Sequence, residues 1–506
     1  MTTVTVTIAP SRCRPPVVWR PVLLIAGVVG VVLGVTSAWY GYFGDEYYFL
    51  SAGARAAPGY ADQPPLLPLL ARALDSLAPG SLVVLRLPAT LLTAATVLVA
   101  AAVTAELGGG RRAQLLAASA SAICPYLLAT GHLLATSTVD PFLWAVVLLL
   151  VVRWIRLDAD EDTAGRARDP LLLGLGVVTA VALLDKVLLP VLLAGLALGV
   201  VVSGPRRMLR RPLLWVGLLL AAASTVPTVL WQAAHGWPQL RMGSVVAGEP
   251  GLFGDRWQFL PRALYYTGLV PGAVLVVMGL WALLRLEALR PWRCVGVAAG
   301  TVTVVLLAAG GRPYYLSGLY VVLFAAGAIA VEAGVLRPRW RWAVSPTCVA
   351  VSALVTAVYV LPVGPAAWRS GVDFEVMGQV GWPGFADAVA ARYAALAPDE
   401  RARTAVIAYS YWYASALERE GPSRGLPTTI HSTHRGFGYF APPPDTATTA
   451  LLVGPVPWAA RFCARLVPLE PYVGRDVSPV NDRVPMGLCT PRAPWSAAWP
   501  ALRNLA

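Results

Sequence analysis

Residues 20–50, RPVLLIAGVVGVVLGVTSAWYGYFGDEYYFL, join an apolar stretch directly to a cluster of acidic and aromatic residues. The apolar part, 20–40, is long enough to cross a bilayer, which takes about 20 residues of helix. Arginines precede it, as in a signal peptide. It is, however, longer than the apolar part of such a peptide, and Trp39-Tyr40 stands where a cleavage site needs small residues. We therefore expect this segment to stay in the protein as an anchor.

The rest of the chain repeats this apolar pattern. Hydrophobic residues make up 57% of the 506 residues and charged residues 13%, against about a quarter charged in an average soluble domain. This excludes a soluble fold, a disordered chain and a coiled coil. The sequence predicts a polytopic α-helical membrane protein with about eleven spans. They are expected near 20–40, 82–105, 113–131, 138–157, 170–184, 187–203, 212–232, 263–284, 294–310, 314–334 and 343–363, with 170–203 divided at Asp185-Lys186.

The distribution of positive charge indicates how these spans are oriented. Lys and Arg together number 40 against 27 Asp and Glu, and Lys186 is the single lysine. The arginines form no long basic run of the kind that binds nucleic acid. They concentrate instead in alternate short loops, those near 12–20, 111–112, 153–168, 206–211, 285–293 and 337–341. The positive-inside rule then places the N-terminus in the cytoplasm and the C-terminus outside the cell membrane.

Two large segments are expected outside. The first, 41–81, is an external loop of the transmembrane domain 1–363, and the second is a C-terminal domain, 364–506. The pattern in this tail predicts an α/β unit. Its elements are expected as a helix near 384–397, a strand at 404–409, a helix near 411–420, and strands near 428–431 and 449–453.

The first external loop carries the densest polar cluster. Asp45-Glu46 opens an amphipathic run, and Pro64-Pro65 begins a second helix, since proline is tolerated in a first turn. We expect two helices that lie in the membrane interface and frame a pocket. A second interpretation stays open, in which the acidic residues only stabilise a helix N-terminus.

Three motifs in the chain resemble one family. Asp45-Glu46 with its Tyr/Phe run, followed by GYADQPPL at 59–66, resembles the first external loop of GT-C membrane glycosyltransferases. The likeness is to the family 39-like branch of protein O-mannosyltransferases and lipid A aminoarabinose transferases, and to its bacterial members with a "DELYF…GYxDxPPL" pattern. WQAAHGWP at 231–238 and GRPYY at 311–315 resemble two further segments of these bacterial members.

The resemblance implies an enzyme, a hexosyl- or pentosyltransferase. Such an enzyme moves a sugar from a polyprenyl-phosphate donor in the bilayer to an acceptor on the extracytoplasmic face, with inversion at the anomeric carbon. An acidic residue of the first loop serves as base. The acceptor, whether glycan, lipid, protein or metabolite, is not defined by the motifs, and neither is the sugar.

The resemblance also implies roles for single residues. Asp45 matches the catalytic aspartate and Glu46 its neighbour. Gln63 stands where the aminoarabinose transferases have a basic residue, which leaves the donor phosphate to Arg55, Lys186 or Arg312. The full set of substrate-binding candidates is Arg55, Tyr60, Asp62, Gln63, His132, Asp140, Lys186, His235, Arg312 and Tyr315.

Several of these candidates have a simpler interpretation. Asp140 precedes a proline and can cap a helix. Lys186 can pair with Asp185 and extend its amine towards the interface. His132 fits an interfacial polar residue.

No metal site is predicted with certainty. Some relatives use a divalent cation, so one stays possible here. His431 and His434 lack the partners of a metal motif and are expected in a solvated loop. No other cofactor is expected.

Two other classes of function remain open from the sequence. One is a transporter or flippase of a lipid-linked or small polar substrate, although neither repeated halves nor broken midplane helices are visible. The other is a non-catalytic membrane assembly protein whose tail binds a partner.

The cysteines fall in different compartments. Cys463 and Cys489 both lie in the external tail, an oxidising environment, and are expected to form a disulfide. A pair of buried free thiols is the alternative.

The orientation can be tested by labelling introduced cysteines in intact cells. A cysteine at Ser51 or Ser423 is expected to react with a membrane-impermeant maleimide, because both positions are placed outside. A cysteine at Ser203, beside the arginines at 206–211, is expected to stay unlabelled. Labelling with the opposite pattern would contradict the orientation.

Overall fold

The computed structural model describes residues 14–159, 168–249, 256–365, 378–455, 458, 461–474 and 481–505. Residues 12–13 and 160–167, which belong to two of the arginine-rich loops, lie outside these ranges. The chain forms two compact units. Unit 1 comprises Met1–Thr36, Arg86–Pro227 and Val246–Leu361, and unit 2 comprises Ser37–Leu85, Thr228–Val245 and Pro362–Ala506. Unit 2 thus combines the C-terminal tail with the loop 41–81 and the segment Thr228–Val245. That residues 364–506 form a domain of their own stays a prediction.

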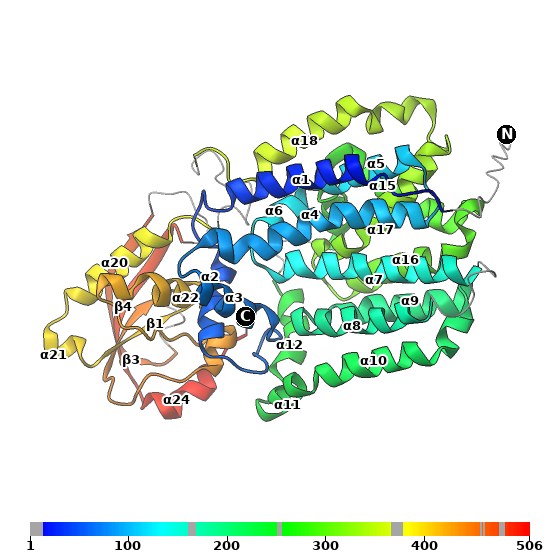
Figure 1. Ribbon diagram of the computed structural model, residues 1–506. Coiled ribbons are helices and arrows are strands. Elements are labelled where there is room, and N and C mark those ends of the chain that lie inside the picture. The colour runs from blue at the N-terminus through cyan, green and yellow to red at the C-terminus, as the bar shows by residue number, and fades with distance from the viewer. Residues whose placement is uncertain are drawn as a thin grey trace. The chain divides into compact units, whose positions relative to one another are not determined.

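Unit 1 is built from helices, most of them apolar (Figure 1). Its α-helices are α1 (Trp19–Thr36), α4 (Leu82–Glu106), α5 (Arg111–Ala122), α6 (Pro125–Gly131), α7 (Thr136–Ala159), α8 (Pro170–Asp185), α9 (Leu189–Ser203), α10 (Pro212–Ser224), α14 (Phe259–Tyr265), α15 (Leu269–Arg285), α16 (Arg293–Ala308), α17 (Ser317–Glu332) and α18 (Pro346–Val360). Two more helices, α11 (Val226–Ala234) and α12 (Pro238–Ala247), make up most of the segment Thr228–Val245, which belongs to unit 2. Short 3₁₀ helices are η2 (Arg206–Arg210), η3 (Arg256–Gln258), η4 (Glu287–Trp292), η5 (Pro313–Leu316) and η6 (Pro338–Val344).

The described residues contain six helices long and apolar enough to cross a bilayer, or up to nine if each of three bent pairs forms one span. The helices α8 and α9 are shorter, with 16 and 15 residues. Their break falls at Asp185-Lys186, where the sequence predicted it. The protein is a multi-pass membrane protein, and eleven as the number of spans stays a prediction.

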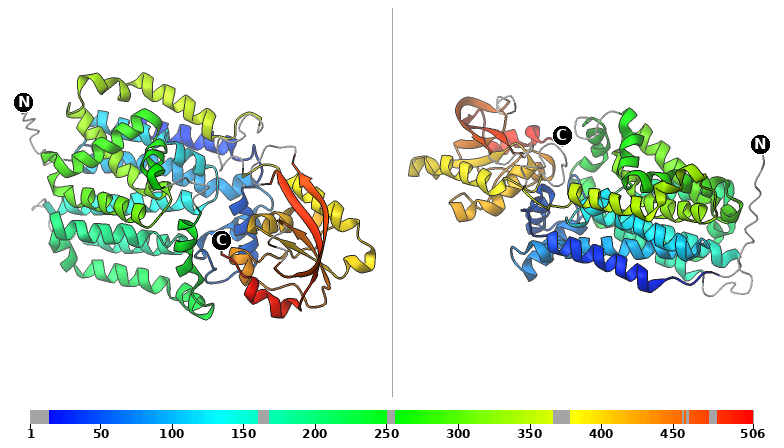
Figure 2. Two further views of the ribbon diagram at one scale, coloured as in Figure 1. Left: turned by 180° about the vertical axis from the view of Figure 1, so that it is seen from behind. Right: turned by 90° about the horizontal axis from the view of Figure 1, so that it is seen from above.

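Glycines let the helices of unit 1 approach closely. α8 packs against α10 and α9 against α16, and these helices run alongside one another in Figures 1 and 2. A Cβ on Gly176 of α8 would lie 2.2 Å from the Cα of Gly217 in α10. In a bilayer, lipid is as apolar as the helix surface, so close backbone packing of small residues replaces the hydrophobic drive of water-soluble bundles.

Residues 41–81 form the expected pair of helices, while their place in the membrane interface and the pocket between them stay predictions. The helices are α2 (Gly44–Ala54) and α3 (Leu66–Leu77), which pack against each other in unit 2. Ser51 of α2 is buried. The outer label is therefore better placed at Ser76 of α3, which is exposed as Ser423 is.

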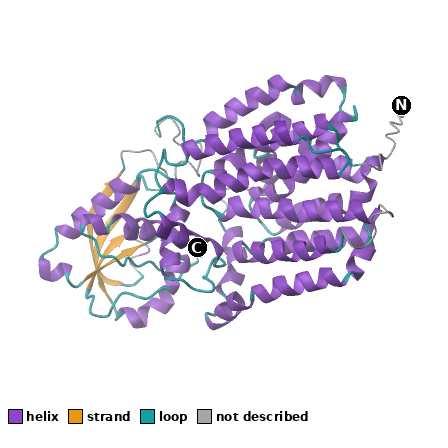
Figure 3. Ribbon diagram, viewed as in Figure 1, coloured by secondary structure: helices purple, strands orange, loops and turns teal. Residues whose placement is uncertain are grey.

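The tail forms an α/β unit with a four-stranded sheet, drawn in orange in Figure 3. Its strands are β1 (Thr404–Ala408), β2 (Thr449–Val453), β3 (Cys463–Val473) and β4 (Arg483–Pro491), in the order β1-β2-β4-β3. β1 and β2 are parallel, with Thr404 opposite Thr449, and the other pairs are antiparallel. The helices of the tail are α20 (Trp382–Ala394), α21 (Pro398–Arg401), α22 (Tyr411–Glu420) and α24 (Trp495–Leu502), with 3₁₀ helices η8 (Pro422–Arg424) and η9 (Arg435–Tyr439).

The sequence predicted this sheet only in part. β1, β2, α20 and α22 are confirmed. The strand expected at 428–431 is wrong, because only one bridge, between Ile407 and His431, forms there. The hairpin β3–β4 was missed, since Pro468 and Pro471 in β3 obscure a strand pattern. Proline is tolerated here because β3 lies at the edge of the sheet, where no neighbour needs its missing N–H.

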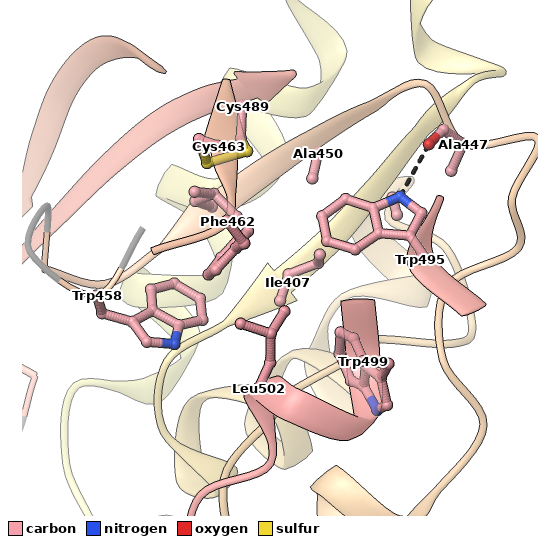
Figure 4. Close-up of a cluster of buried hydrophobic side chains, with 12 residues drawn as sticks. Ile407, Ala447, Ala450, Trp458, Phe462, Cys463, Cys489, Trp495, Trp499 and Leu502 are labelled. Carbon is pink, nitrogen blue, oxygen red and sulfur yellow. Dashed lines mark hydrogen bonds between the residues drawn. A yellow bond between two sulfur atoms is a disulfide. The ribbon is translucent and has the colours of Figure 1, made fainter. Parts of the chain in front are cut away.

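A cluster of buried aromatic side chains forms the core of the sheet unit (Figure 4). Trp495 and Trp499 of α24 lie beside Ile407 of β1 and Phe462 in this cluster. The indole Nε1 of Trp495 donates a hydrogen bond of 2.8 Å to the carbonyl of Ala447. The polar atom of this tryptophan is thus satisfied while its ring is buried, as a stable core requires.

Cys463 and Cys489 form a disulfide at one side of this cluster. Their Cα atoms are 5.5 Å apart, and the two cysteines lie on neighbouring strands of the β3–β4 hairpin. The bridge joins residues 26 apart in sequence.

We expect Cys463 and Cys489 to resist thiol labelling in unreduced, denatured protein. Cys348, a free cysteine in the structure, serves as the internal positive control. Replacing both with serine should lower the stability of unit 2 by about 3 kcal/mol, since the open chain regains loop entropy. Free thiols at both positions in the unreduced protein would contradict the bridge.

Candidate active site

The start of helix α2 separates the roles of its two acidic residues. The carboxylate of Glu46 is fully buried, and its Oε2 accepts a hydrogen bond of 2.9 Å from the backbone N–H of Phe43. Glu46 therefore caps the N-terminus of α2, which is the simpler interpretation that the sequence left open. Among the described residues, Asp45 accepts no hydrogen bond from the backbone at this helix start. Its carboxylate contacts the C-terminal tail instead.

Asp45 is bound by two side chains of α22. Trp412 Nε1 donates to Asp45 Oδ1 at 2.7 Å, and Tyr411 Oη donates to the same oxygen at 2.9 Å. Gly44 permits this contact, because a Cβ at that position would lie 2.1 Å from the Trp412 ring. Both bonds end on Oδ1, so the carboxylate is oriented while Oδ2 takes part in neither bond.

A second acidic residue joins this group from the same loop. Tyr48, one turn after Asp45 on α2, donates from its hydroxyl to Asp62 Oδ1 at 2.7 Å. The rings of Tyr48 and Tyr411 meet edge to face, with centroids 4.9 Å apart. Burial raises the pKa of both tyrosines well above 10, so both hydroxyls stay protonated and serve as donors. Asp45, Tyr48, Asp62, Tyr411 and Trp412 form what we call the two-acid group.

The electrostatics of Asp62 differ from those of an exposed carboxylate. Burial raises the pKa of Asp62, and the nearby charge of Asp45 raises it further. The positive charge of Arg435 and the hydrogen bond from Tyr48 act in the opposite direction. Two carboxylates are thus held together because a guanidinium and hydroxyl donors offset their repulsion.

Arg435 was missed by the sequence analysis. It opens η9, and its Cζ lies 5.2 Å from the ring centroid of Tyr411. Its neighbour Gly436 lies directly against Tyr48 and Asp62, since a Cβ there would be 1.8 Å from Tyr48 Oη. No sequence motif marks Arg435, which comes from a loop far along the chain from Asp45.

Three other candidates of the first loop have structural partners. Arg55 forms an ion pair with Glu418 of α22. Tyr60 Oη donates to the carbonyl of Ala52 at 2.9 Å. Gln63 is buried, and its Nε2 has no hydrogen-bond partner among the described residues.

The WQAAHGWP segment contributes Gln232 to the first loop. Gln232 Nε2 donates to the carbonyl of Tyr60 at 2.7 Å. His235, the candidate of this segment, is exposed and stacks on Trp231 with ring centroids 3.9 Å apart. The segment therefore braces the loop through its glutamine.

The remaining candidates lie in unit 1 and form a second group. Lys186 Nζ lies 4.5 Å from the ring centroid of Tyr315 and 5.5 Å from that of Tyr314. Its charge also interacts with Asp140 and Asp185. Arg312 donates to Glu249 Oε2 at 2.7 Å and to Tyr314 Oη at 3.1 Å.

The structure bears on all three of the simpler interpretations, those of Asp140, Lys186 and His132. Asp140 lies inside α7, which begins at Thr136, so helix capping is wrong for it. Both carboxylate oxygens of Asp185 lack a hydrogen-bond partner in the described part of the chain, so Lys186 and Asp185 are not a hydrogen-bonded pair there. His132 is fully buried, with Nδ1 3.3 Å from the carbonyl of Leu128, so its imidazole is enclosed by protein.

The two histidines of the tail are not in a solvated loop, as the sequence had suggested. His431 is buried, and its Nδ1 lies 3.1 Å from the carbonyl oxygen of Ala441. Burial lowers the pKa of His431 to about 4 and that of His434 to about 3, so both are neutral at physiological pH. Within the described ranges no three His, Cys, Asp or Glu side chains are placed to hold a metal ion.

The chain resembles known proteins in sequence over one segment and in fold over most of its length. The family model described as dolichyl-phosphate-mannose-protein mannosyltransferase matches residues 62–231. No curated protein sequence matches the chain.

Solved structures match it over almost its whole length. ArnT from Cupriavidus metallidurans in the apo state is 16% identical, with a TM-score of 0.59 over 92% of this chain and 97% of that one. The same protein bound to undecaprenyl phosphate is 18% identical, with a TM-score of 0.55 over 93% of this chain and 98% of that one. Arabinofuranosyltransferase AftD from Mycobacteria is 15% identical, with a TM-score of 0.53 over 94% of this chain and 40% of the longer AftD chain. The chain therefore has the fold of the GT-C membrane glycosyltransferases.

Proposed function

We propose that the protein is a membrane glycosyltransferase that moves a sugar from a polyprenyl-phosphate donor to an acceptor on the extracytoplasmic face of the cell membrane. The fold it shares with ArnT, which has been solved with undecaprenyl phosphate, supports a lipid-linked donor. The match of residues 62–231 to a mannosyltransferase model supports sugar transfer. The observation that carries the proposal is the oriented carboxylate of Asp45 on the first external loop.

Asp45 is proposed as the general base. An acceptor hydroxyl is a weak nucleophile until its proton has somewhere to go, and a fixed carboxylate accepts that proton. The hydroxyl oxygen then bonds to the anomeric carbon as the bond from that carbon to the phosphate oxygen breaks. The polyprenyl phosphate leaves with the electron pair, and the configuration inverts because attack and departure occur on opposite faces.

Trp412 and Tyr411 support this role by geometry. Their two donors fix Asp45 Oδ1 and thereby direct the carboxylate plane. Pre-orientation of this kind reduces the entropy that a reacting pair must lose. Asp62, with its own donor Tyr48, is proposed to bind acceptor or donor hydroxyls beside Asp45.

The donor phosphate is proposed to bind the cations of unit 1. Lys186 lies over the ring of Tyr315 and is hydrogen-bonded to neither Asp140 nor Asp185 in the described residues, whereas Arg312 is already paired with Glu249. We therefore assign the larger share of phosphate binding to Lys186. The N-terminus is proposed to be cytoplasmic and the C-terminus extracytoplasmic, in agreement with the arginine-rich loops.

Asp45→Asn is expected to lower turnover by about 10² to 10⁴ fold, because the amide cannot accept the proton. The measurement is transfer of radiolabelled sugar from a synthetic polyprenyl phosphate by purified protein. The matched control is Glu46→Gln, whose side-chain oxygen can still accept the bond from Phe43, so it should cost much less. An Asp45→Asn protein that turns over near the wild-type rate would remove Asp45 as the base.

Lys186→Met is expected to raise the KM for the lipid-linked donor by about 10 to 100 fold, because a charge-assisted contact to phosphate is lost. Lys186→Arg should recover most of the affinity. Arg339→Met, at an exposed arginine of η6, is the control for loss of one positive charge. An unchanged KM in Lys186→Met would assign the phosphate to other residues.

The same transfer assay separates the enzyme from the other classes. A transporter or an assembly protein would move no label to any acceptor, even with native membranes as the acceptor source. Absence of transfer by wild-type protein under these conditions would contradict the proposed function.

A further inference from the structure

Arg435 occupies an unusual position beside the two-acid group. Its backbone φ is 47°, in the left-handed region that a side chain with a Cβ rarely adopts. Such a conformation costs about 1 kcal/mol or more and persists where surrounding contacts impose it. Glycine would remove this strain, yet the chain has an arginine here.

The surrounding contacts hold this backbone in place. The N–H of Arg435 donates to the carbonyl of Asn504 at 2.7 Å, and His434 forms a bridge with the same residue. On the other side, a Cβ on Gly436 would lie 1.8 Å from Tyr48 Oη and 3.3 Å from Asp62 Oδ1. This glycine therefore packs closely on both side chains. Arg435 is thus fixed immediately next to the Tyr48–Asp62 hydrogen bond.

The guanidinium of Arg435 lies over an aromatic ring of the two-acid group, that of Tyr411. Its Cζ lies 5.2 Å from the centroid of the Tyr411 ring, and Tyr411 Oη binds Asp45. A guanidinium over a tyrosine face is attracted by the ring's negative potential. One residue is therefore linked to both acids, to Asp45 through Tyr411 and to Asp62 through charge.

The charge of Arg435 acts on Asp62, Tyr48, Tyr411 and His434. Burial raises the pKa of Asp62, and Arg435 is the foremost influence that lowers it again. Without the guanidinium, Asp62 would take up a proton at higher pH. The titratable groups that face Asp62 and Arg435 from the packed elements are Asp45, Tyr48, Tyr411 and His434.

From this geometry we propose that Arg435 is a positioning residue of the transferase site, which keeps Asp62 ionised and bonded to Tyr48 beside the base Asp45. The inference rests on the proposed function. It adds a residue of the C-terminal tail to the reaction. An ionised Asp62 accepts hydrogen bonds through both oxygens, whereas a protonated one would offer a donor and would no longer hold the Tyr48 hydroxyl in the same way.

The central test compares Arg435→Met with Arg435→Lys. Both variants keep a side chain at φ 47°, so backbone strain is matched, and only the lysine keeps the charge. With purified full-length protein and a radiolabelled polyprenyl-phosphate sugar, Arg435→Met should lower kcat at neutral pH by about tenfold or more. The acid limb of its kcat/KM profile should move to higher pH, while Arg435→Lys should keep the limb near its wild-type position.

A further variant, Arg435→Gly, tests whether the effects of Arg435→Met come from misfolding. Arg435→Gly loses the charge but relieves the left-handed strain, and it keeps the backbone bond to Asn504. It should show the same displaced acid limb as Arg435→Met. Arg465→Met, at an exposed position of edge strand β3, is the control for removal of an arginine from the tail.

A readout without activity tests the same link. Because the pKa of Asp62 is raised by folding, ionisation of Asp62 costs stability as pH rises through its titration range, and the charge of Arg435 offsets that cost. The melting temperature of Arg435→Met should therefore fall below that of Arg435→Lys as pH rises through this range. In an Asp62→Asn background the pH-dependent difference should vanish.

The outcomes separate the two proposals. If both Arg435→Met and Arg435→Gly kept the wild-type kcat and an unmoved acid limb, the proposed role of Arg435 would be overturned, while the proposed function would stand. A pH-dependent melting difference that persists in Asp62→Asn would also overturn it. Failure of wild-type protein to transfer sugar would instead contradict the proposed function, while the melting comparison would still report on Arg435 and Asp62.

Discussion

Two hydrogen bonds to one oxygen of Asp45 organise unit 2. They come from neighbouring residues of α22, Tyr411 and Trp412, and end on the helix that opens the first external loop. Bonds to an ionised carboxylate are stronger than bonds between neutral groups, and here they join segments more than 360 residues apart in sequence. The loop and the tail thus fold as one unit, and the candidate base is fixed by the tail.

Other contacts of unit 2 reinforce this connection. Glu418 of α22 pairs with Arg55 at the end of α2, and Arg419 pairs with Asp75 of α3. The small residue Gly44 lets the Trp412 ring reach the start of α2. Through these ion pairs and the bonds to Asp45, α22 holds both α2 and α3. The position of Asp45 therefore depends on a helix that contains none of the motifs quoted from the sequence.

The membrane places a different constraint on unit 1. A backbone in lipid must satisfy its polar groups internally, so the apolar segments become helices and pack through small residues such as Gly176 and Gly217. Polar side chains are costly in that environment and are retained where they act on one another or on a substrate. Lys186, Asp140 and Asp185 form such a group, flanked by the rings of Tyr314 and Tyr315.

The sequence by itself determined the membrane class, the break at Asp185-Lys186, the helices α2 and α3, and the strands β1 and β2. Each of these follows from a local pattern of apolar residues or from proline near a helix start, which the chain carries wherever it folds. Tertiary structure alone decided that Glu46 caps a helix while Asp45 binds Tyr411 and Trp412, that His431 is buried, and that Arg435 stands beside Asp62. It also decided that β3, with its prolines, forms an edge strand. These outcomes depend on contacts between side chains that are far apart in the sequence. Packing and charge in the folded protein stabilise such contacts, and no local sequence pattern encodes them.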